Sequence, residues 1–373
     1  MPGKSNLSRN LRRFAGKQIR RFGLVPEGQP DGIGEDESLA GQGFSEQILF
    51  IFPDGPSNLY QVEVWLPTLE VLNTAMSTAL VTQDSRVANY LRAITNLRVY
   101  VIANYRTFET MSDNGKQRLA LYPAHHNRNF QYLRRTDFAH AYIGHGESEK
   151  AVSASGQMRA YDFVFIAGEA AKARAGSISF FNPDERMIVV GRPQLTPIIS
   201  GPLRNSPPTV LYAPTWEGAQ PSMNYSSLTK MGEDIVDHLQ AAGFLVIFRP
   251  HPRTGISDRN YATVAQRLQA IAEPHQHNLI DDFNLADLLI TDISSVLIDW
   301  LATHRPVLVT NINDGEAEVT RLNPGDDIVS EVKRLLADSP DYSKLRAHYV
   351  TDTSPNAFEE GCRRAIAAFE AQS

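Results

Sequence analysis

The sequence predicts an α/β protein built from two Rossmann-like domains of similar size. From Gln47 onward, short apolar runs alternate with helical patterns, which is typical of βαβ units and parallel sheets. A segment rich in proline and glycine, 199–208, divides these runs into two series. The 373 residues also exceed what a single hydrophobic core usually supports. We therefore expect three regions: a tail and linker over 1–46 and domains over 47–200 and 201–373.

The first 22 residues carry seven basic side chains and no acidic one. Leu7, Leu11 and Phe14 recur at roughly helical spacing among them, which predicts a basic amphipathic helix that binds an anionic membrane surface. A solvated arm is the alternative. Residues 23–45 are rich in Gly, Pro and acidic side chains and predict a flexible linker.

The first series of apolar runs predicts the strands of the domain over 47–200. These runs are ILFIFP (48–53), ALVTQ (79–83), LRVYVIA (97–103), AYIG (141–144), FVFIAG (163–168) and MIVVG (187–191). The second series predicts the sheet of the other domain, with TVLYAP (209–214), FLVIFRP (244–250), NLI (278–280), DLLITD (287–292) and PVLVTNI (306–312). Ligands of parallel sheets bind beyond the carboxyl ends of the strands, so we look for chemistry there.

Composition excludes several classes of protein. Cys362 is the only cysteine, so an internal disulfide is impossible and a reducing, cytoplasmic location fits best. No apolar run approaches the length of a membrane span, and no signal peptide is recognisable. Beyond the tail, 29 basic residues stand against 42 acidic ones, which argues against nucleic acid as a partner.

Known cofactor and metal motifs give no support for either kind of group. The sequence has no GxGxxG or Walker motif, no Asp-x-Asp, and no His pair with zinc-site spacing. We therefore expect a reaction without cofactor or metal.

His145 follows the predicted strand AYIG and lies between two glycines. An imidazole near its usual pKa can accept a proton at neutral pH, so His145 is a candidate general base. A structural histidine is the alternative interpretation.

The sequence Arg-Pro-His-Pro-Arg, 249–253, follows the strand FLVIF. Arg249, His251 and Arg253 alternate with two prolines, so their donors lie on a stiff, extended segment suited to phosphate oxygens. A solvent-exposed basic turn is the alternative.

The strand that ends in Thr291 and Asp292 is followed by Ser294, Ser295 and a helical pattern. The first turn of such a helix offers backbone N–H groups to an anion, and Asp292 or Ser294 can cap it. Asp299 lies one turn further along and either reaches a substrate hydroxyl or faces solvent. Simple capping of a buried helix is the alternative.

Other histidines and tryptophans have more ordinary interpretations. His125 and His126 are predicted to lie on a loop surface, because nothing nearby completes a ligand set. Trp65 lies in a helical pattern and is predicted to pack in a core, as is Trp300. Trp216 follows a strand, and with Thr215 it is expected to line the site.

In order along the chain, these elements resemble the CDP-glycerol glycerophosphotransferase family of teichoic-acid synthesis. The matching stretches are GHGESEK (144–150), VLYAPTWEG (210–218), RPHPR (249–253) and DLLITDISSVLIDW (287–300), and the resemblance covers roughly residues 138–312. It implies a GT-B fold, in which two Rossmann-like domains face each other across a cleft. It also implies attack of an acceptor hydroxyl on the β-phosphate of CDP-glycerol with release of CMP, and peripheral association with the inner face of the cell membrane.

The resemblance also implies roles for residues of this chain. His145 becomes the base, while His251, Ser294 and Ser295 hold the pyrophosphate. Arg249, Arg253 and Thr291 are further phosphate-binding candidates. The remaining candidates for the cleft are Lys150, Arg192, Thr215, Asp292 and Asp299.

Three positions depart from the family pattern. Gly144 stands where the family commonly has Trp, Ile293 stands where it has Tyr, and Arg192 precedes its proline where the family's arginine follows it. The transferred group therefore stays open between glycerol phosphate, another polyol phosphate and a sugar. Two other functions also stay open: a GT-B glycosyltransferase or epimerase that uses a UDP-sugar, and a protein that binds polymer without turnover.

Overall fold

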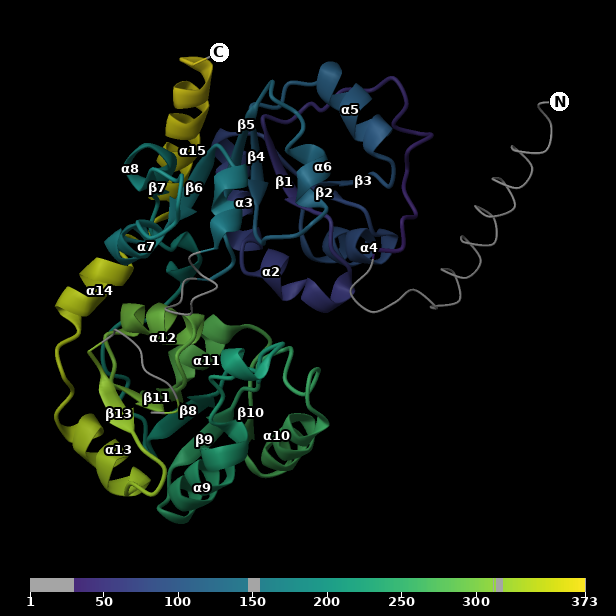
Figure 1. Ribbon diagram of the computed structural model, residues 1–373. Coiled ribbons are helices and arrows are strands. Elements are labelled where there is room, and N and C mark those ends of the chain that lie inside the picture. The colour runs from purple at the N-terminus through teal and green to yellow at the C-terminus, as the bar shows by residue number, and fades with distance from the viewer. Residues whose placement is uncertain (1–29, 147–154, 311, 313–317, 373) are drawn as a thin grey trace. The chain divides into compact units, whose positions relative to one another are not determined.

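The computed structural model describes residues 30–146, 155–310, 312 and 318–372. The chain forms two compact units (Figure 1). The first contains the described residues up to His145, together with Gln157–Phe165 and the residues from Glu359 onward. The second is built mainly on Ile166–Phe358. The boundary passes through strand β6, and the expected domain limit at residue 200 stays a prediction.

The first sheet is parallel and buried. Among the described residues it has seven strands in the order β3-β2-β1-β4-β5-β6-β7. The strands are β1 (Ile48–Phe52), β2 (Thr78–Thr82), β3 (Arg98–Val101), β4 (Leu119–Tyr122), β5 (Ala139–Tyr142), β6 (Phe163–Ile166) and β7 (Met187–Val189). In β1, every residue is buried, because helices and loops cover both faces of such a sheet.

Helices connect the strands of the first sheet. They are α2 (Tyr60–Glu63), α3 (Leu66–Ala75), α4 (Ser85–Ile94), α5 (Tyr105–Asp113), α6 (Asn129–Tyr132), α7 (Glu169–Ala175) and α8 (Pro183–Arg186). One face of the sheet packs Leu49 and Ile51 against Phe108 and Met111 of α5 and Tyr132 of α6. The side chain of Asp84 accepts hydrogen bonds from the first N–H groups of α4, which fixes where that helix begins.

The second sheet is also parallel, and its described strands run in the order β10-β9-β8-β11-β12-β13. They are β8 (Thr209–Ala213), β9 (Leu245–Phe248), β10 (Glu273–Pro274), β11 (Leu288–Thr291), β12 (Val307–Thr310) and β13 (Thr320–Leu322). The register pairs Leu288 with Val210, so the ends of β8 and β11 lie side by side.

Helices cover both faces of the second sheet (Figure 1). On one face lie α9 (Leu228–Ala241), α10 (Arg259–Ile271) and α13 (Ile328–Ala337). On the other lie α11 (Leu279–Leu285), α12 (Ser295–Trp300) and α14 (Ser343–Tyr349). The last helix, α15 (Pro355–Glu370), begins in the second unit and continues into the first.

The predicted α/β class with two parallel sheets is confirmed. Each predicted strand overlaps an observed one except 278–280, which was wrong: Asn278 caps α11, and the two apolar residues after it are the first of that helix. Strands β4, β10 and β13 were not predicted.

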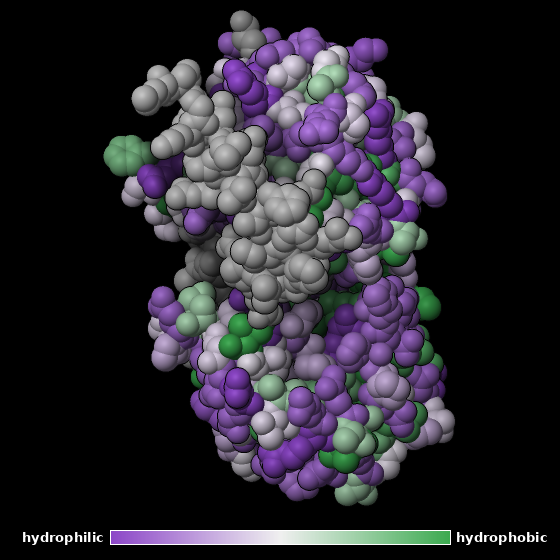
Figure 2. Space-filling model, turned by 90° about the vertical axis from the view of Figure 1, so that its right-hand side faces the viewer, coloured by the Kyte–Doolittle hydropathy of each residue, from purple (hydrophilic) through white to green (hydrophobic). Residues whose placement is uncertain are grey.

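The visible surface is mostly hydrophilic (Figure 2), whereas most residues of the strands in both sheets are buried. On the face shown in Figure 2, hydrophilic side chains predominate and hydrophobic ones are scattered among them. Within the described part of the chain, no helix combines the length and the hydropathy required to cross a bilayer.

Candidate functional site

Each sheet has a point where the strand order reverses direction. In the first sheet this point lies between β1 and β4, and in the second it lies between β8 and β11. Open α/β sheets bind ligands in the crevice beyond the carboxyl ends of such strands. The residues that follow these four strands are therefore the first candidates for a site.

Asp292 joins the ends of β8 and β11. Its carboxylate accepts hydrogen bonds from the N–H of Thr215 at 2.8 Å and from the N–H of Ser227 at 3.2 Å. It also accepts one from the hydroxyl of Thr310, at the end of β12. The side chain is fully buried, and burial raises the pKa of Asp292 despite these hydrogen bonds, which lower it. Asp292 thus orients three chain segments and does not cap α12.

Ser294 is the N-cap residue of α12, yet its hydroxyl makes no capping hydrogen bond. That hydroxyl is buried and has no hydrogen-bond partner among the residues that the structure describes. Buried polar groups are normally satisfied, so a buried hydroxyl of this kind is a candidate ligand contact. Helix α12 itself has only six residues. Nearby, the hydroxyl of Thr291 donates to the carbonyl of Ala213 at 2.7 Å.

His251 lies in the loop after β9, and a backbone contact sets its tautomer. The N–H of Arg253 donates to Nδ1 of His251 at 3.0 Å. Nδ1 therefore lacks a proton, and the neutral ring carries its proton on Nε2, which makes Nε2 a donor. The ring stacks beside Trp216, with centroids 6.2 Å apart, and the guanidinium of Arg253 lies 4.7 Å from the centroid of the same indole. His251, Arg253 and Trp216 thus form one cluster.

Arg249 anchors the beginning of this loop to neighbouring segments. Its Nη1 donates to Asp282 at 2.6 Å and to the carbonyl of Gln276 at 3.0 Å. Asp282 is fully buried, so the pair is shielded from solvent on the carboxylate side. The structure therefore separates the two arginines of the motif: Arg249 is tied to Asp282, and Arg253 lies over Trp216.

Glu217 was not singled out from the sequence. Its buried carboxylate accepts hydrogen bonds from the N–H groups of Gly255, Ser257 and Asp258, at 3.1, 2.9 and 3.2 Å. It therefore holds the end of the His251 loop at the start of α10. Its position in the sequence, next to Trp216 in the loop after a predicted strand, was the one feature that could have identified it.

Arg192 and Asp299 pair with each other. Nε and Nη2 of Arg192 donate to the two carboxylate oxygens of Asp299 at 2.9 and 2.8 Å. Both side chains are at most 8% exposed. Burial raises the pKa of Asp299, while Arg192 opposes that change. Asp299 therefore does not face solvent, and its contact with a substrate hydroxyl stays a prediction.

His145 follows β5 in the first unit, and its ring is oriented by the backbone. Nδ1 lies 2.9 Å from the carbonyl oxygen of Pro123, which can only accept, so Nδ1 carries the proton. The neutral ring then carries its lone pair on Nε2, as a general base requires. The ring also meets Tyr60 edge to face at 5.6 Å. Gly144 has a φ of +61°, a conformation that favours glycine, and Trp65 donates to its carbonyl.

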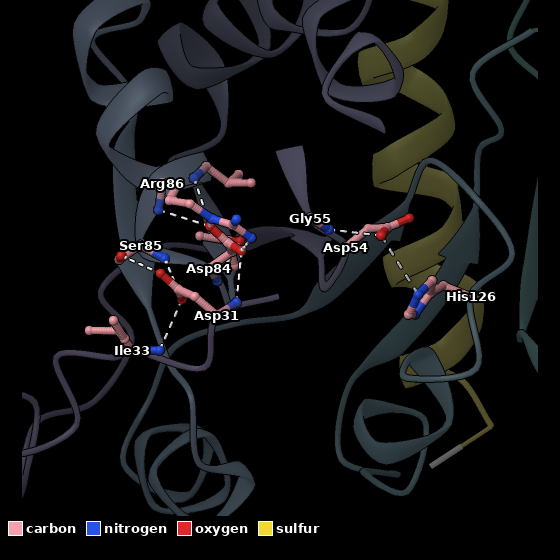
Figure 3. A network of polar contacts seen from close by, with 10 residues as sticks. Asp31, Ile33, Asp54, Gly55, Asp84, Ser85, Arg86 and His126 are labelled. Carbon is pink, nitrogen blue, oxygen red and sulfur yellow. Dashed lines mark hydrogen bonds and ion pairs between the residues drawn. The ribbon is translucent and has the colours of Figure 1, made fainter. Parts of the chain in front are cut away.

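His125, His126 and Asp54 lie at the reversal point of the first sheet. His125 is half-buried and stacks face to face on Tyr142, with ring centroids 4.0 Å apart. His126 has its Nε2 3.9 Å from a carboxylate oxygen of Asp54 (Figure 3). The predicted loop is confirmed, but its surface position is wrong for His125, because the aromatic stack buries much of the ring.

A second polar network follows β2 (Figure 3). Asp31 accepts hydrogen bonds from the N–H and the hydroxyl of Ser85, at 3.0 and 2.5 Å, and its own N–H donates to Asp84 at 2.8 Å. Asp84 in turn binds Arg86 at 2.6 Å. These contacts fix the segment around Asp31 against the beginning of α4, so the predicted flexible linker over 23–45 is wrong for this segment.

Lys150 and the basic tail over 1–22 lie outside the described residues. No group of three or more His, Cys, Asp or Glu side chains placed to hold a metal occurs in the described ranges.

Comparisons with known proteins found one family model that matches part of the chain and several solved structures that share its fold. Residues 199–317 match the family model described as CDP-glycerol:poly(glycerophosphate) glycerophosphotransferase. No curated protein sequence matches the chain. Among solved structures, a variant of the wall teichoic acid polymerase TagF is similar at a TM-score of 0.56 and 11% identity, covering 98% of this chain and 97% of that one.

Two other solved structures share the fold. A glycosyltransferase from Rickettsia africae has a TM-score of 0.54 at 11% identity, covering 88% of this chain and 100% of that one. A putative UDP-N-acetylglucosamine 2-epimerase from Listeria monocytogenes has a TM-score of 0.56 at 12% identity, covering 88% and 98%. The fold is thus of the GT-B type. The family match over 199–317 confirms the resemblance to the CDP-glycerol glycerophosphotransferase family and indicates an enzyme of the transferase type.

Proposed function

We propose that this protein transfers a polyol phosphate from a CDP-linked donor to a hydroxyl of a lipid-linked or polymeric acceptor, releasing CMP, in the synthesis of teichoic acid or a related surface polymer. The family match over 199–317 carries the proposal, because it includes the strand ends of the second sheet from Thr215 to Ser295. A TagF variant soaked with CDPG has the same fold, which supports a CDP-linked donor.

The second unit is assigned to the donor. The Nε2–H of His251 can donate a hydrogen bond to an oxygen of a pyrophosphate. The hydroxyl of Ser294, which has no hydrogen-bond partner among the described residues, can do the same. Arg253 adds a positive charge to the same cluster, while Arg249 supports the loop through Asp282. Ser295, Thr215 and Thr291 complete the proposed binding surface, and Asp292 holds it in place.

The first unit is assigned to the base. In the proposed step, Nε2 of His145 accepts the proton of the acceptor hydroxyl while the oxygen attacks the β-phosphorus. A new P–O bond forms as the bond from that phosphorus to the bridging oxygen breaks, and CMP leaves with the electron pair. The carbonyl of Pro123 keeps the Nδ1 proton in place, so the ring accepts at Nε2 alone.

The test is a panel of CDP-linked and UDP-linked donors assayed for nucleotide release. We expect CMP from CDP-glycerol or a related CDP-polyol. His145→Ala should abolish transfer and leave the dissociation constant of the donor within about twofold, whereas His251→Ala should weaken both. His275→Ala is the matched control, because His275 is exposed and lies outside the proposed machinery. Full turnover by His145→Ala would refute the role of the base.

Two alternatives predict different results in the same panel. The Rickettsia and Listeria structures share the fold to the same degree as TagF, which favours a test of UDP-sugars. Release of UDP in place of CMP would establish a glycosyltransferase or epimerase. Binding of polymer with no nucleotide product, unchanged in His145→Ala, would establish a binding protein without turnover.

We further propose a cytoplasmic protein whose residues 1–22 bind the inner face of the membrane. The seven basic and no acidic side chains in this segment support electrostatic attraction to anionic lipid. Deletion of 1–22 should release the protein from vesicles containing phosphatidylglycerol and preserve turnover with a water-soluble acceptor. Continued vesicle binding after the deletion would exclude the tail as the anchor.

A further inference from the structure

We infer that Asp54 and His126 form a subsite that binds a neutral hydroxyl group of the acceptor, at the strand-order reversal of the first sheet. The inference deepens the proposed function and rests on it for the identity of the acceptor. Asp54 follows β1 and His126 follows β4, and these two strands are neighbours in the sheet. The pair therefore lies at the edge of the sheet beyond which open α/β sheets bind their ligands.

The carboxylate of Asp54 is held in a fixed orientation. Its Oδ1 accepts a hydrogen bond from the N–H of Gly55 at 2.7 Å, and its Oδ2 accepts one from the side chain of Asn58 at the same distance. The residue is buried, with 8% of its surface exposed. Each oxygen has a further lone pair, so Asp54 can still accept a hydrogen bond from a ligand.

The imidazole of His126 is fixed in the complementary state. Its Nδ1 accepts the N–H of Arg128 at 3.1 Å, so the neutral ring carries its proton on Nε2. Nε2 lies 3.9 Å from Oδ1 of Asp54, which is too long for a hydrogen bond. A donor and an acceptor thus lie opposite each other at a distance longer than a hydrogen bond, and Figure 3 marks this contact with a dashed line.

The distance between these two atoms suits a hydroxyl oxygen that bridges them. An oxygen placed about 2.8 Å from both would accept a hydrogen bond from Nε2–H and donate its own proton to Oδ1. Phosphate is disfavoured at this position, because its negative charge would lie next to the negative charge of the carboxylate. The pair therefore selects alcohols and polyols over anions.

The same chain segment serves the proposed base. Pro123, three residues before His126, supplies the carbonyl that orients His145. His125, the residue before His126, stacks on Tyr142, three residues before His145. The segment after β4 is therefore fixed both to the last residue of β5 and to His145, which follows that strand. A polyol held by Asp54 and His126 would present its other hydroxyl groups along this shared edge of the sheet.

Binding can be measured without donor or turnover. We expect glycerol and ribitol, titrated into protein labelled with ¹⁵N-histidine, to shift the Nε2 resonance of His126 in a saturable manner. Inorganic phosphate should not produce this shift, and the exposed His275 reports any nonspecific solvent effect. No saturable shift at His126 with either polyol, or a larger one with phosphate, would overturn the inference.

Variants test the same contact in binding and in transfer. His126→Phe keeps a flat ring and removes Nε2–H, so polyol affinity should fall about tenfold, the usual effect of losing one hydrogen bond. His126→Gln, whose amide can donate in place of Nε2–H, should recover part of it. In the transfer assay we expect a comparable rise in acceptor KM, with donor KM within about twofold. His275→Phe is the matched control.

The outcomes separate this inference from the proposed function. If polyols bind at His126 but no CDP-linked donor is used, the proposed function fails and the subsite stands. If CMP is released normally and His126→Phe leaves acceptor KM unchanged, the subsite fails and the proposed function stands. Should His126→Phe lose its fold by circular dichroism, the titration of the unaltered protein still decides the question.

Discussion

The indole N–H of Trp65 donates a hydrogen bond to the carbonyl oxygen of Gly144, across 2.6 Å. Trp65 is 2% exposed and is the N-cap residue of α3, while Gly144 is the residue immediately before His145. The start of α3 therefore fixes the backbone that carries the imidazole. The related family commonly has a tryptophan next to this histidine; here Gly144 takes that position with a positive φ, and an indole distant in sequence contacts it.

Replacing Trp65 by Phe removes this hydrogen bond and keeps most of the buried ring. We expect the free energy of unfolding to fall by about 1–3 kcal/mol, because the carbonyl of Gly144 loses its buried donor. We also expect kcat to fall roughly tenfold with little change in donor KM, because the base loses its alignment. The ¹⁵N shifts of His145 should show a smaller fraction of the Nδ1–H tautomer.

Trp300→Phe is the control for this change. Trp300 is fully buried, and its indole N–H donates to the carbonyls of Arg305 and Pro306 at 3.1 Å. It should lose similar stability and leave the tautomer of His145 unaltered. Equal effects of both variants on His145 would show that Trp65 acts only through overall stability.

Ser294→Ala should separate donor binding from stability. Because the hydroxyl of Ser294 makes no hydrogen bond with the described residues, its loss should change the free energy of unfolding by less than about 0.5 kcal/mol. Ser226→Ala, the matched control, removes a hydroxyl that donates to the carbonyl of Thr215 at 2.7 Å and should cost about 1 kcal/mol. Calorimetry with CDP-glycerol should show weaker binding in Ser294→Ala; unchanged affinity would remove Ser294 from the donor site.

Arg192 and Asp299 should behave as one structural unit. Asp299→Leu leaves a buried guanidinium without its carboxylate, so we expect a loss of about 3–5 kcal/mol in the free energy of unfolding. Arg192→Met should cost a similar amount for the converse reason. The double variant should recover much of the loss, which urea denaturation would detect as a coupling energy. Additive losses would indicate that other partners dominate.

Acid should destabilise the first unit through His125. Burial, aided by the nearby charge of His145, lowers the pKa of His125 from 6.5 to about 4. Between these values the unfolded chain binds the proton and the folded chain does not, so stability falls as pH decreases from about 6.5 to about 4. The contribution amounts to about 3 kcal/mol in the free energy of unfolding. Urea denaturation at a series of pH values would measure it.

His125→Phe keeps the stack on Tyr142 and removes the titrating group. Its stability should depend less steeply on pH over this range. Burial also lowers the pKa of His126 and of His140, so part of the slope should remain. An unchanged slope in His125→Phe would mean that the ring of His125 is accessible to protons in the folded protein.

The sequence predicts the fold well because buried parallel strands leave continuous apolar runs between helical patterns. Strand β4, Leu119–Tyr122, was not predicted although all four of its residues are buried. Strand β13, Thr320–Leu322, lies at the edge of the sheet with only Leu322 buried, so it lacks an apolar run. The run at 278–280 was predicted as a strand but begins helix α11, because the side chain of Asn278 caps that helix. Such a capping contact cannot be recognised from the spacing of apolar residues.

The site is predicted only in part. Thr215, Asp292 and Ser294 are predicted because they follow the carboxyl ends of parallel strands, and that position depends on topology alone. Topology does not predict that the carboxylate of Asp292 accepts hydrogen bonds from three chain segments. Nor does it predict the ion pair between Arg192 and Asp299, which lie 107 residues apart in the sequence. Nor does it show the tautomers of His145 and His251, which depend on single backbone atoms of Pro123 and Arg253.

Helix α15 has a consequence for synthesis of the chain. Residues from Glu359 onward belong to the first unit, although all of Ile166–Phe358 precedes them on the ribosome. Cys362 on this helix is fully buried, and Glu370 pairs with Arg118 at 2.5 Å. The nascent first unit must therefore wait, with part of its apolar surface uncovered, until translation of the second unit is complete.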